Sequence, residues 1–270
     1  MKVQTLDLWR KEEYQYGERI PTITTYIGDT DKKKSAIIIC PGGGYGHLSK
    51  REAEPVALQF LAKGYHAFVV KYSLSPIRHP QPLLDVAKAI QVVRENAEEW
   101  YVDPDKIIVL GFSAGGHVAG SIAVYWNDKL IQEKLKVDAE QIKPNGSILC
   151  YPVITAGEFA HQGSVNNLLG ENADHKAKDD MSLEKQVGKH TPPTFIWHTI
   201  TDASVPVENS LLYINALQKH KVPFEAHLYD KGVHGLALAT EETCDGRDEL
   251  IDFHIASWIH QASEWIERNI

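Results

Sequence analysis

The sequence has few cysteines and lacks the patterns of a metal site. Cys40, Cys150 and Cys244 are the only cysteines and are scattered over 270 residues, which excludes a disulfide framework and a cysteine-based zinc site. Cys40 and Cys150 each end an apolar run, where a cysteine typically packs as a small buried hydrophobe. The 13 histidines include no H-E-x-x-H pattern, so we expect no bound metal.

Positive charge and long apolar stretches are also scarce. The 28 Lys and Arg are outnumbered by 36 Asp and Glu, and the formal net charge is -8, so no surface for nucleic acid or an anionic membrane is expected. No stretch approaches the roughly 20 apolar residues of a membrane helix, and residues 1–21 hold no apolar core of signal-peptide length. We therefore expect a soluble, cytoplasmic protein that acts on small molecules, neutral polymers or protein partners.

Short β-branched runs alternate with segments of helical period along the chain. The apolar runs lie at residues 35–40, 66–73, 106–112, 146–154, 194–199 and 224–230. The segments with apolar residues every three or four positions lie at residues 51–64, 80–100, 114–126, 207–220 and 249–269. Runs that are apolar throughout are typical of strands buried on both faces of a parallel sheet. The pattern predicts one α/β domain over residues 1–270, with helices on both faces of the sheet.

Two stretches depart from this alternation. Residues 17–28 alternate between apolar and polar side chains, as an edge hairpin would. Residues 155–192 are polar and have no strong period. Because a connection of this length inside a compact domain is usually functional, we predict that residues 155–192 form a small lid or a pocket wall.

Ser113 lies in the stretch VLGFSAGGHVAG, where Gly111 and Gly115 complete the pattern G-x-S-x-G. In a strand-turn-helix, such glycines allow a sharp turn that projects the serine Oγ from the carboxyl end of the sheet. The N–H of Ala114 then lies at the start of a helix, where it can stabilise negative charge. The pattern favours a nucleophile, and a packing turn with an inert serine is the alternative.

A second glycine-rich stretch, CPGGGYG, begins at Cys40. Three consecutive glycines are costly to order and exceed what a turn needs, which suggests that bare backbone N–H groups approach a ligand. In acyl transfer that ligand is the oxyanion, with Gly42 and Gly43 as the expected donors and Gly44 as an alternative one residue on. A phosphate loop is disfavoured because no Lys-Ser/Thr follows and no G-x-G-x-x-G is completed.

Two later loops supply a base for the serine and a carboxylate to orient that base. Asp202 follows the run 194–199, and His234 follows the run 224–230. The carboxyl ends of parallel strands share one edge of a sheet, so both side chains can converge on Ser113. The chain order serine, aspartate, histidine is the one associated with this sheet topology.

Two other residues compete for these roles, and two more could line the pocket. His117 lies one helical turn after the serine, and we expect it to pack along the helix rather than act as the base. Asp230, four residues before His234, could orient the base or simply form a turn, and Asp202 is preferred because its place at a strand end matches that of the other site residues. His198 and His47 could line the pocket, although a structural or solvent-facing place is the more common one.

The chain resembles the α/β-hydrolase superfamily, and within it the bacterial esterase/lipase group that includes carbohydrate acetyl esterases of the acetyl-xylan esterase type. The resemblance runs from about residue 35 to residue 240, through CPGGGY, VDPDKIIVLGFSAGGHVA, TPPTFIWHTITDASVPVENS and YDKGVHGL. It implies a mostly parallel sheet of about eight strands and no cofactor. It also implies a nucleophile, a base, its acidic partner and oxyanion donors at Ser113, His234, Asp202, Gly42, Gly43 and Ala114.

Two positions depart from the pattern of this group. Pro41 stands where related lipases and esterases often have histidine before the glycines. His198 and Thr199 stand where many relatives carry His-Gly, which could shift the Asp202 loop slightly. Neither change removes a catalytic group. The large helical cap of some lipases has no counterpart at the N-terminus, so only residues 155–192 could cover the pocket.

The motifs together predict a serine carboxylesterase for short acyl esters, with a small-molecule or oligosaccharide ester such as an acetylated sugar or xylan fragment as substrate. We expect Tyr45 and residues 155–192 to contact the substrate. An amide-directed hydrolase with the same triad, either an arylformamidase or a peptidase, and a non-catalytic receptor of the same fold are the alternatives. The oligomeric state is left open, with a homodimer among the alternatives. Because His234 must be neutral to accept a proton, activity is expected to rise with pH.

Overall fold

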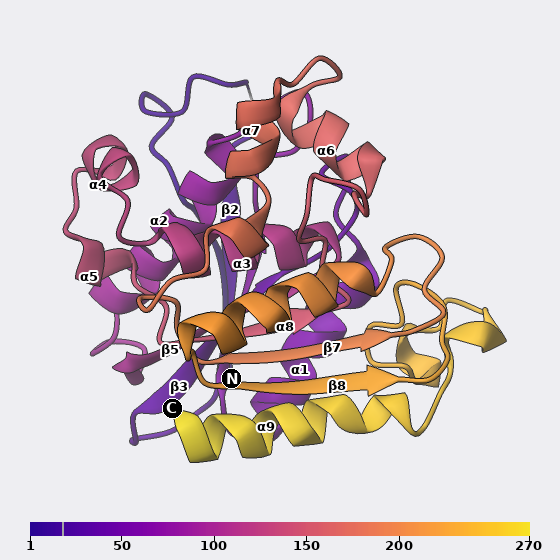
Figure 1. The fold of residues 1–270 in the computed structure, drawn as a ribbon. Helices are drawn as coiled ribbons and strands as arrows, with labels where there is room; N and C mark the ends of the chain where they lie inside the picture. Colours follow the sequence, from indigo (N-terminus) through magenta and orange to yellow (C-terminus); the bar gives the residue numbers. More distant parts are fainter. Residues whose placement is uncertain (18) are drawn as a thin grey trace.

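One eight-stranded sheet forms the centre of the computed structural model, which describes residues 1–17 and 19–270 (Figure 1). In chain order the strands are β1 (Lys2–Asp7), β2 (Thr22–Ile27), β3 (Lys34–Cys40), β4 (His66–Lys71), β5 (Val102–Phe112), β6 (Gly146–Cys150), β7 (Thr194–Thr199) and β8 (Phe224–Tyr229). Across the sheet their order is β1-β2-β4-β3-β5-β6-β7-β8. The pairs β1·β2 and β2·β4 are antiparallel, and the neighbours from β4 to β8 are parallel. The predicted mostly parallel sheet is confirmed.

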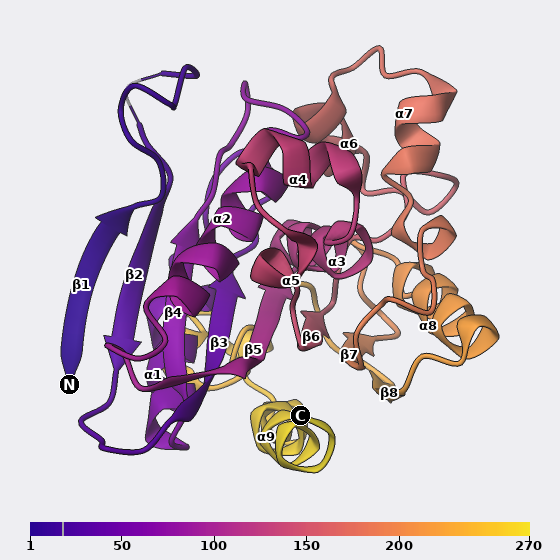
Figure 2. The same ribbon diagram turned by 90° about the vertical axis from the view of Figure 1, so that its left-hand side faces the viewer.

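Helices cover both faces of the sheet, as predicted. They are α1 (Glu54–Ala62), α2 (Gln81–Glu95), α3 (Ala114–Tyr125), α4 (Lys129–Leu135), α5 (Ala139–Ile142), α6 (Gln162–Leu169), α7 (His175–Asp180), α8 (Glu208–His220) and α9 (Trp258–Asn269). Figure 2 shows α1 and α9 on one face, with α2, α3 and α8 on the other. The shorter helices α4 to α7 lie on the same side as α2 and α3. Among the described residues, no helix has both the length and the apolar character needed to cross a membrane.

The side chains of β3 explain why the central strands are apolar throughout. Ala36, Ile38 and Cys40 pack into the core beneath α2 and α3. Ile37 and Ile39 point to the opposite face and pack into the core beneath α1 and α9. Successive residues of a strand face opposite sides, so a strand covered by helices on both sides has no polar face to present.

The predicted hairpin over residues 17–28 needs a correction. Only Thr22–Ile27 forms a strand there, and its antiparallel neighbours are β1 on one side and β4 on the other. β1 was missed because it is an edge strand whose side chains are mostly exposed, which leaves few apolar positions to mark it. Residue 18 of this stretch lies outside the described residues.

The closing helix is shorter than predicted. It begins at Trp258, and residues 248–257 contain the 3-10 turns η4 (Asp248–Leu250) and η5 (Ile255–Ser257). The Asp252 carboxylate accepts the N–H groups of His254 and Ile255 at 2.9 and 3.1 Å. A side chain that bonds the backbone two and three residues ahead favours a turn over a continuing helix, so the helix starts only after this turn.

Candidate active site

Ser113 occupies the turn between β5 and α3. Its backbone has φ 53° and ψ −120°, a conformation rare outside glycine. A Cβ on Gly111 would lie 2.1 Å from the Gly115 carbonyl oxygen, and one on Gly115 would lie 2.1 Å from the Cys40 carbonyl oxygen. Both positions therefore need glycine for strand, helix and loop to approach, which is the geometry that the G-x-S-x-G pattern predicts.

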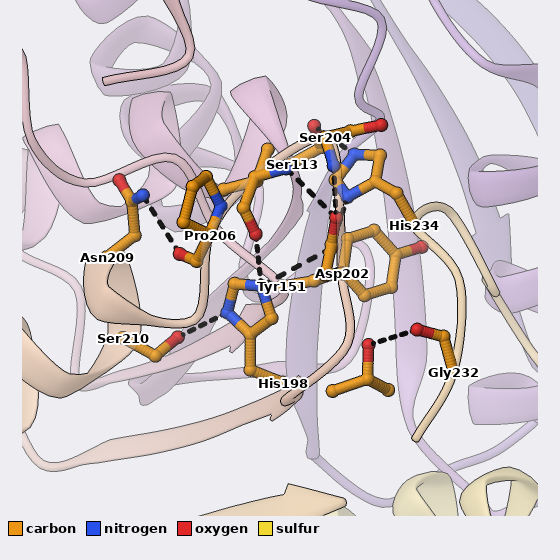
Figure 3. A network of polar contacts seen from close by, with 12 residues as sticks. Ser113, Tyr151, His198, Asp202, Ser204, Pro206, Asn209, Ser210, Gly232 and His234 are labelled. Atoms are coloured by element: carbon orange, nitrogen blue, oxygen red, sulfur yellow. Dashed lines mark hydrogen bonds and ion pairs between the residues drawn. The ribbon is translucent and has the colours of Figure 1, made fainter. Parts of the chain in front are cut away.

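The structure brings the three predicted triad residues into one chain of hydrogen bonds. His234 Nε2 lies 2.8 Å from Ser113 Oγ, and His234 Nδ1 lies 2.6 Å from Asp202 Oδ2 (Figure 3). Asp202 follows β7 and His234 follows β8, so both reach the serine from the carboxyl edge of the sheet. With its proton on Nδ1, the imidazole donates to the carboxylate and accepts the serine O–H.

The Asp202 carboxylate is buried and accepts several hydrogen bonds. The residue is 6% exposed, and its Oδ1 accepts the backbone N–H groups of Ser204 and Val205, each at 2.9 Å. Burial raises the pKa of this carboxyl, but hydrogen bonds from His198 and His234 outweigh burial and hold the pKa well below its usual range. Asp202 is therefore ionised at neutral pH. Asp230, the competing acid, is exposed and lies outside this network.

The prediction that Tyr45 contacts the substrate is corrected by the structure. Tyr45 is 2% exposed, and its hydroxyl lies 2.8 Å from His117 Nδ1. His117 Nε2 lies 2.9 Å from the Met181 carbonyl oxygen, so its N–H donates there and its Nδ1 accepts from Tyr45. Burial lowers the pKa of His117 to about 4, which keeps this ring neutral. Both residues have a packing role, the one predicted for His117.

The glycine loop presents a different set of N–H groups from the one predicted. The N–H of Gly42 donates to Glu52 Oε2 at 2.8 Å, so Gly42 is not available to an oxyanion. Gly43 and Gly44 are partly exposed, with φ 127° and 63°. Within the described part of the chain, the N–H groups of Gly43, Gly44 and Ala114 donate no hydrogen bond. The register therefore shifts by one residue, toward the alternative that includes Gly44.

Residues 155–192 fold against the glycine loop and the nucleophile helix. They contain α6, α7 and the 3-10 turn η2 (Leu183–Lys185). The Asn167 side chain donates to the Gly44 carbonyl at 2.8 Å, the Met181 carbonyl accepts from His117, and Leu183 is completely buried. Of the two predicted roles, lid or pocket wall, these contacts favour the pocket wall.

His161, at the N-terminus of α6, is a site residue that sequence reasoning missed. Its Nδ1 accepts from the Ser164 N–H at 3.2 Å and lies 2.7 Å from the Ser164 hydroxyl, which assigns the ring proton to Nε2. A Cβ on Gly44 would lie 3.9 Å from His161 Cε1. Burial, and after it the charge of His234, lowers the pKa of His161. The partly exposed His161 ring therefore lies beside the glycine loop and within the electrostatic influence of the triad.

Glu52 and Tyr151 were also missed. Tyr151 follows β6 at the same sheet edge as the triad, a position that could have been noticed in the sequence. Its ring contacts His234, with 5.1 Å between centroids and 72° between planes. Glu52 lies in the segment 51–64, whose apolar period predicts an amphipathic helix, and no motif signals that its carboxylate is buried at 3% exposure.

The fold and the site together define an α/β-hydrolase: a mostly parallel sheet, a serine at the turn after β5, and its aspartate and histidine after β7 and β8. The family model BD-FAE matches residues 25–217. The chain belongs to the BD-FAE family and so to the α/β-hydrolase esterases.

Known relatives agree with this membership. Endo-1,4-beta-xylanase B of Butyrivibrio fibrisolvens is 40% identical over 247 residues, which are 89% of this chain and 39% of the relative. The acetylxylan esterase of Xylanibacter ruminicola is 33% identical over 211 residues, 76% of this chain and 42% of the relative. The chain thus spans about two fifths of the length of these two curated relatives. The crystal structure of an acetyl ester-xyloside bifunctional hydrolase from Caldicellulosiruptor lactoaceticus is 40% identical, with a TM-score of 0.86 over 98% of this chain and 96% of that one.

Proposed function

We propose that this chain is a serine carboxylesterase that removes short acyl groups, acetyl above all, from the hydroxyls of sugars such as xylo-oligosaccharides. The observation that carries the proposal is the relay in which His234 joins Ser113 Oγ at 2.8 Å to Asp202 Oδ2 at 2.6 Å. A serine becomes a nucleophile when an oriented base can take its proton, and the N–H groups of the glycine loop and Ala114 stand beside it.

The reaction follows from these positions. Ser113 Oγ attacks the ester carbonyl while His234 Nε2 takes the hydroxyl proton, and the ionised Asp202 stabilises the imidazolium. The N–H groups of Gly43 or Gly44, together with that of Ala114, receive the oxyanion. His234 then gives its proton to the leaving alcohol. Water repeats the cycle on the acyl-enzyme and releases the acid.

Two observations support an acetyl group on an oxygen-rich alcohol. His161 is partly exposed and lies beside Gly44 of the glycine loop, so its ring N–H can donate to a sugar oxygen. Two of the relatives carry acetylxylan or acetyl ester-xyloside in their names.

The decisive experiment compares wild type with Ser113→Ala on p-nitrophenyl acetate and on acetylated xylo-oligosaccharides. We expect the variant to lose kcat by at least about 10⁴-fold and to escape covalent labelling by a fluorophosphonate. An ester panel of increasing acyl length should show the highest kcat/KM for acetyl. Equal turnover by both proteins would end the proposal, and higher kcat/KM on aryl amides than on esters would overturn its ester part.

A further inference from the structure

A buried carboxylate lies behind the catalytic serine, outside the triad. Glu52 ends the 3-10 turn η1 (Lys50–Glu52) and is 3% exposed. Its Oε2 accepts the Gly42 N–H and its Oε1 accepts the Tyr151 hydroxyl, both at 2.8 Å. Among residues 1–17 and 19–270, no Lys, Arg or His forms an ion pair with it. A carboxylate buried without a cation is costly, so these two donors are its compensation.

The two donors belong to opposite sides of the active site. Gly42 opens the glycine loop, and a Cβ on it would lie 3.1 Å from Ser113 Cβ. The Tyr151 hydroxyl, on the other side, accepts the Ala237 N–H at 2.9 Å, three residues after His234. A continuous chain of hydrogen bonds therefore runs from the glycine loop through Glu52 to the loop that carries the base.

The turn η1 also binds the loop that carries His234 through a second side chain. Arg51 Nη1 donates to the carbonyl oxygens of Gly235 and Thr243, each at 2.9 Å. Gly235 is the residue that follows His234. Neighbouring side chains of one short turn thus hold the loop of the base, while only Glu52 also holds the glycine loop.

We propose, resting on the esterase function above, that Glu52 is a positioning residue that keeps the oxyanion donors and the base in register with each other. With the Gly42 N–H bound to Glu52, the N–H groups of Gly43 and Gly44 are the ones left for the oxyanion. With Tyr151 held by the same carboxylate, its ring stays packed on His234. Hydrogen-bond donors stabilise a transition state only where they are already placed, so this placement acts on kcat more than on substrate binding.

Accepting both donors at once needs two acceptor oxygens, which a carboxylate supplies. The Gly42 N–H can only donate, and the Tyr151 hydroxyl donates to Glu52 because it already accepts from Ala237. A glutamine has a single acceptor oxygen. In Glu52→Gln, whose volume is unchanged, the amide oxygen accepts only one of the two donors: with the Gly42 N–H on the oxygen, the NH₂ meets the Tyr151 hydroxyl oxygen, and the Tyr151 O–H loses its acceptor.

The test measures kcat and KM for p-nitrophenyl acetate in Glu52→Gln, Tyr151→Phe and the double variant, with rates divided by active sites titrated with a fluorophosphonate. We expect kcat to fall between about 10-fold and 100-fold in Glu52→Gln with KM changed less than about threefold. Tyr151→Phe should lose less, and the double variant should be no worse than Glu52→Gln, because both changes break one network.

A matched control is Asp85→Asn, which replaces another buried carboxylate. Asp85 accepts from Trp9, Ser73 and Gln81, all outside the triad and the glycine loop. The Asp85→Asn variant should have a lower midpoint of thermal unfolding and an unchanged kcat per titrated active site. Wild-type kcat in both Glu52→Gln and Tyr151→Phe overturns the proposal, as does an additive loss in the double variant. If Glu52→Gln does not fold, wild-type kcat in Tyr151→Phe alone overturns it. Failure of the esterase function itself is distinct, since wild type would then show neither labelling nor turnover.

Discussion

His198 Nε2 lies 3.4 Å from Asp202 Oδ2, the carboxylate oxygen that also accepts from His234. Figure 3 shows His198 reaching this carboxylate from β7. The ring is completely buried, with Nδ1 2.7 Å from Ser210 Oγ and Nε2 3.0 Å from the Val205 carbonyl oxygen. A neutral ring with its proton on Nε2 fits all of these partners. Its N–H is shared between the Val205 carbonyl and the Asp202 carboxylate, which fixes the loop of the acid to the sheet.

Replacing His198 by alanine should therefore weaken catalysis through Asp202. We expect kcat/KM for p-nitrophenyl acetate to fall about 10-fold to 100-fold, because the carboxylate that orients His234 loses a donor and the support of its loop. His198→Gln, which keeps an N–H donor, should recover part of the loss. Rates are compared per titrated active site. Equal kcat/KM in the alanine variant and wild type would show that the 3.4 Å contact has no catalytic effect.

Sequence reasoning could place the triad because each of its members lies in the loop after a strand. Ser113 immediately follows β5, Asp202 lies in the loop after β7 and His234 in the loop after β8. β8 is an edge strand with mostly exposed or half-buried side chains, not the apolar run that was predicted, but its end still marks the loop of the base. Parallel strands deliver their carboxyl ends to one edge. The positions of the strands in the sequence were therefore enough to predict that the three side chains lie close together, without any knowledge of side-chain packing.

The partners of the glycine loop could not be found in the same way. Gly42 was predicted as a donor because nothing in CPGGGYG distinguishes one glycine from the next. The register is set by Glu52, ten residues away in the chain. Tyr45 was expected to face the substrate, but His117, 72 residues away, accepts its hydroxyl in the core. Such pairings depend on tertiary packing, which neither periodicity nor motif spacing encodes.

His161 provides a test of substrate selection. Asparagine is a good N-cap residue, so His161→Asn should keep the start of α6 while its shorter amide no longer reaches the place of the imidazole Nε2. We expect KM for acetylated xylo-oligosaccharides to rise roughly 3-fold to 10-fold, the effect of losing about one hydrogen bond. kcat/KM for p-nitrophenyl acetate, which has no sugar, should stay within about twofold of wild type.

The control for His161→Asn is Asp174→Ala, which removes the side-chain cap of α7 at the Ala177 N–H. Asp174→Ala should cost about 1 kcal/mol of stability and leave kcat and KM for both substrates unchanged. Both parameters are measured by steady-state kinetics on the two substrates. A change of equal size on both would mean that His161 supports the site without contacting the alcohol part of the substrate.

The buried ring of His117 gives the fold a dependence on pH. Its pKa is lowered to about 4 by burial, whereas a histidine in an unfolded chain titrates near 6.5. Between these pH values His117 is protonated in the unfolded state and neutral in the folded state. Stability is therefore complete above about pH 6.5, falls as the pH drops toward about 4, and loses up to about 3 kcal/mol over that window.

Urea unfolding of wild type and His117→Gln between pH 8 and 4.5 measures this contribution. The variant should be less stable at pH 8, because it breaks the bond to Tyr45, but its profile should be flatter below pH 6.5. His79, whose pKa burial also lowers to about 4, titrates in both proteins, so the difference between the two profiles measures His117 together with its interaction with His79. The hydrogen-bond donors of Asp202 lower the pKa of its carboxyl. The stability that this carboxylate contributes is therefore lost only at pH values below the usual carboxyl range, outside this window. Parallel profiles would mean that His117 takes up its proton without unfolding the core around Tyr45 and Met181.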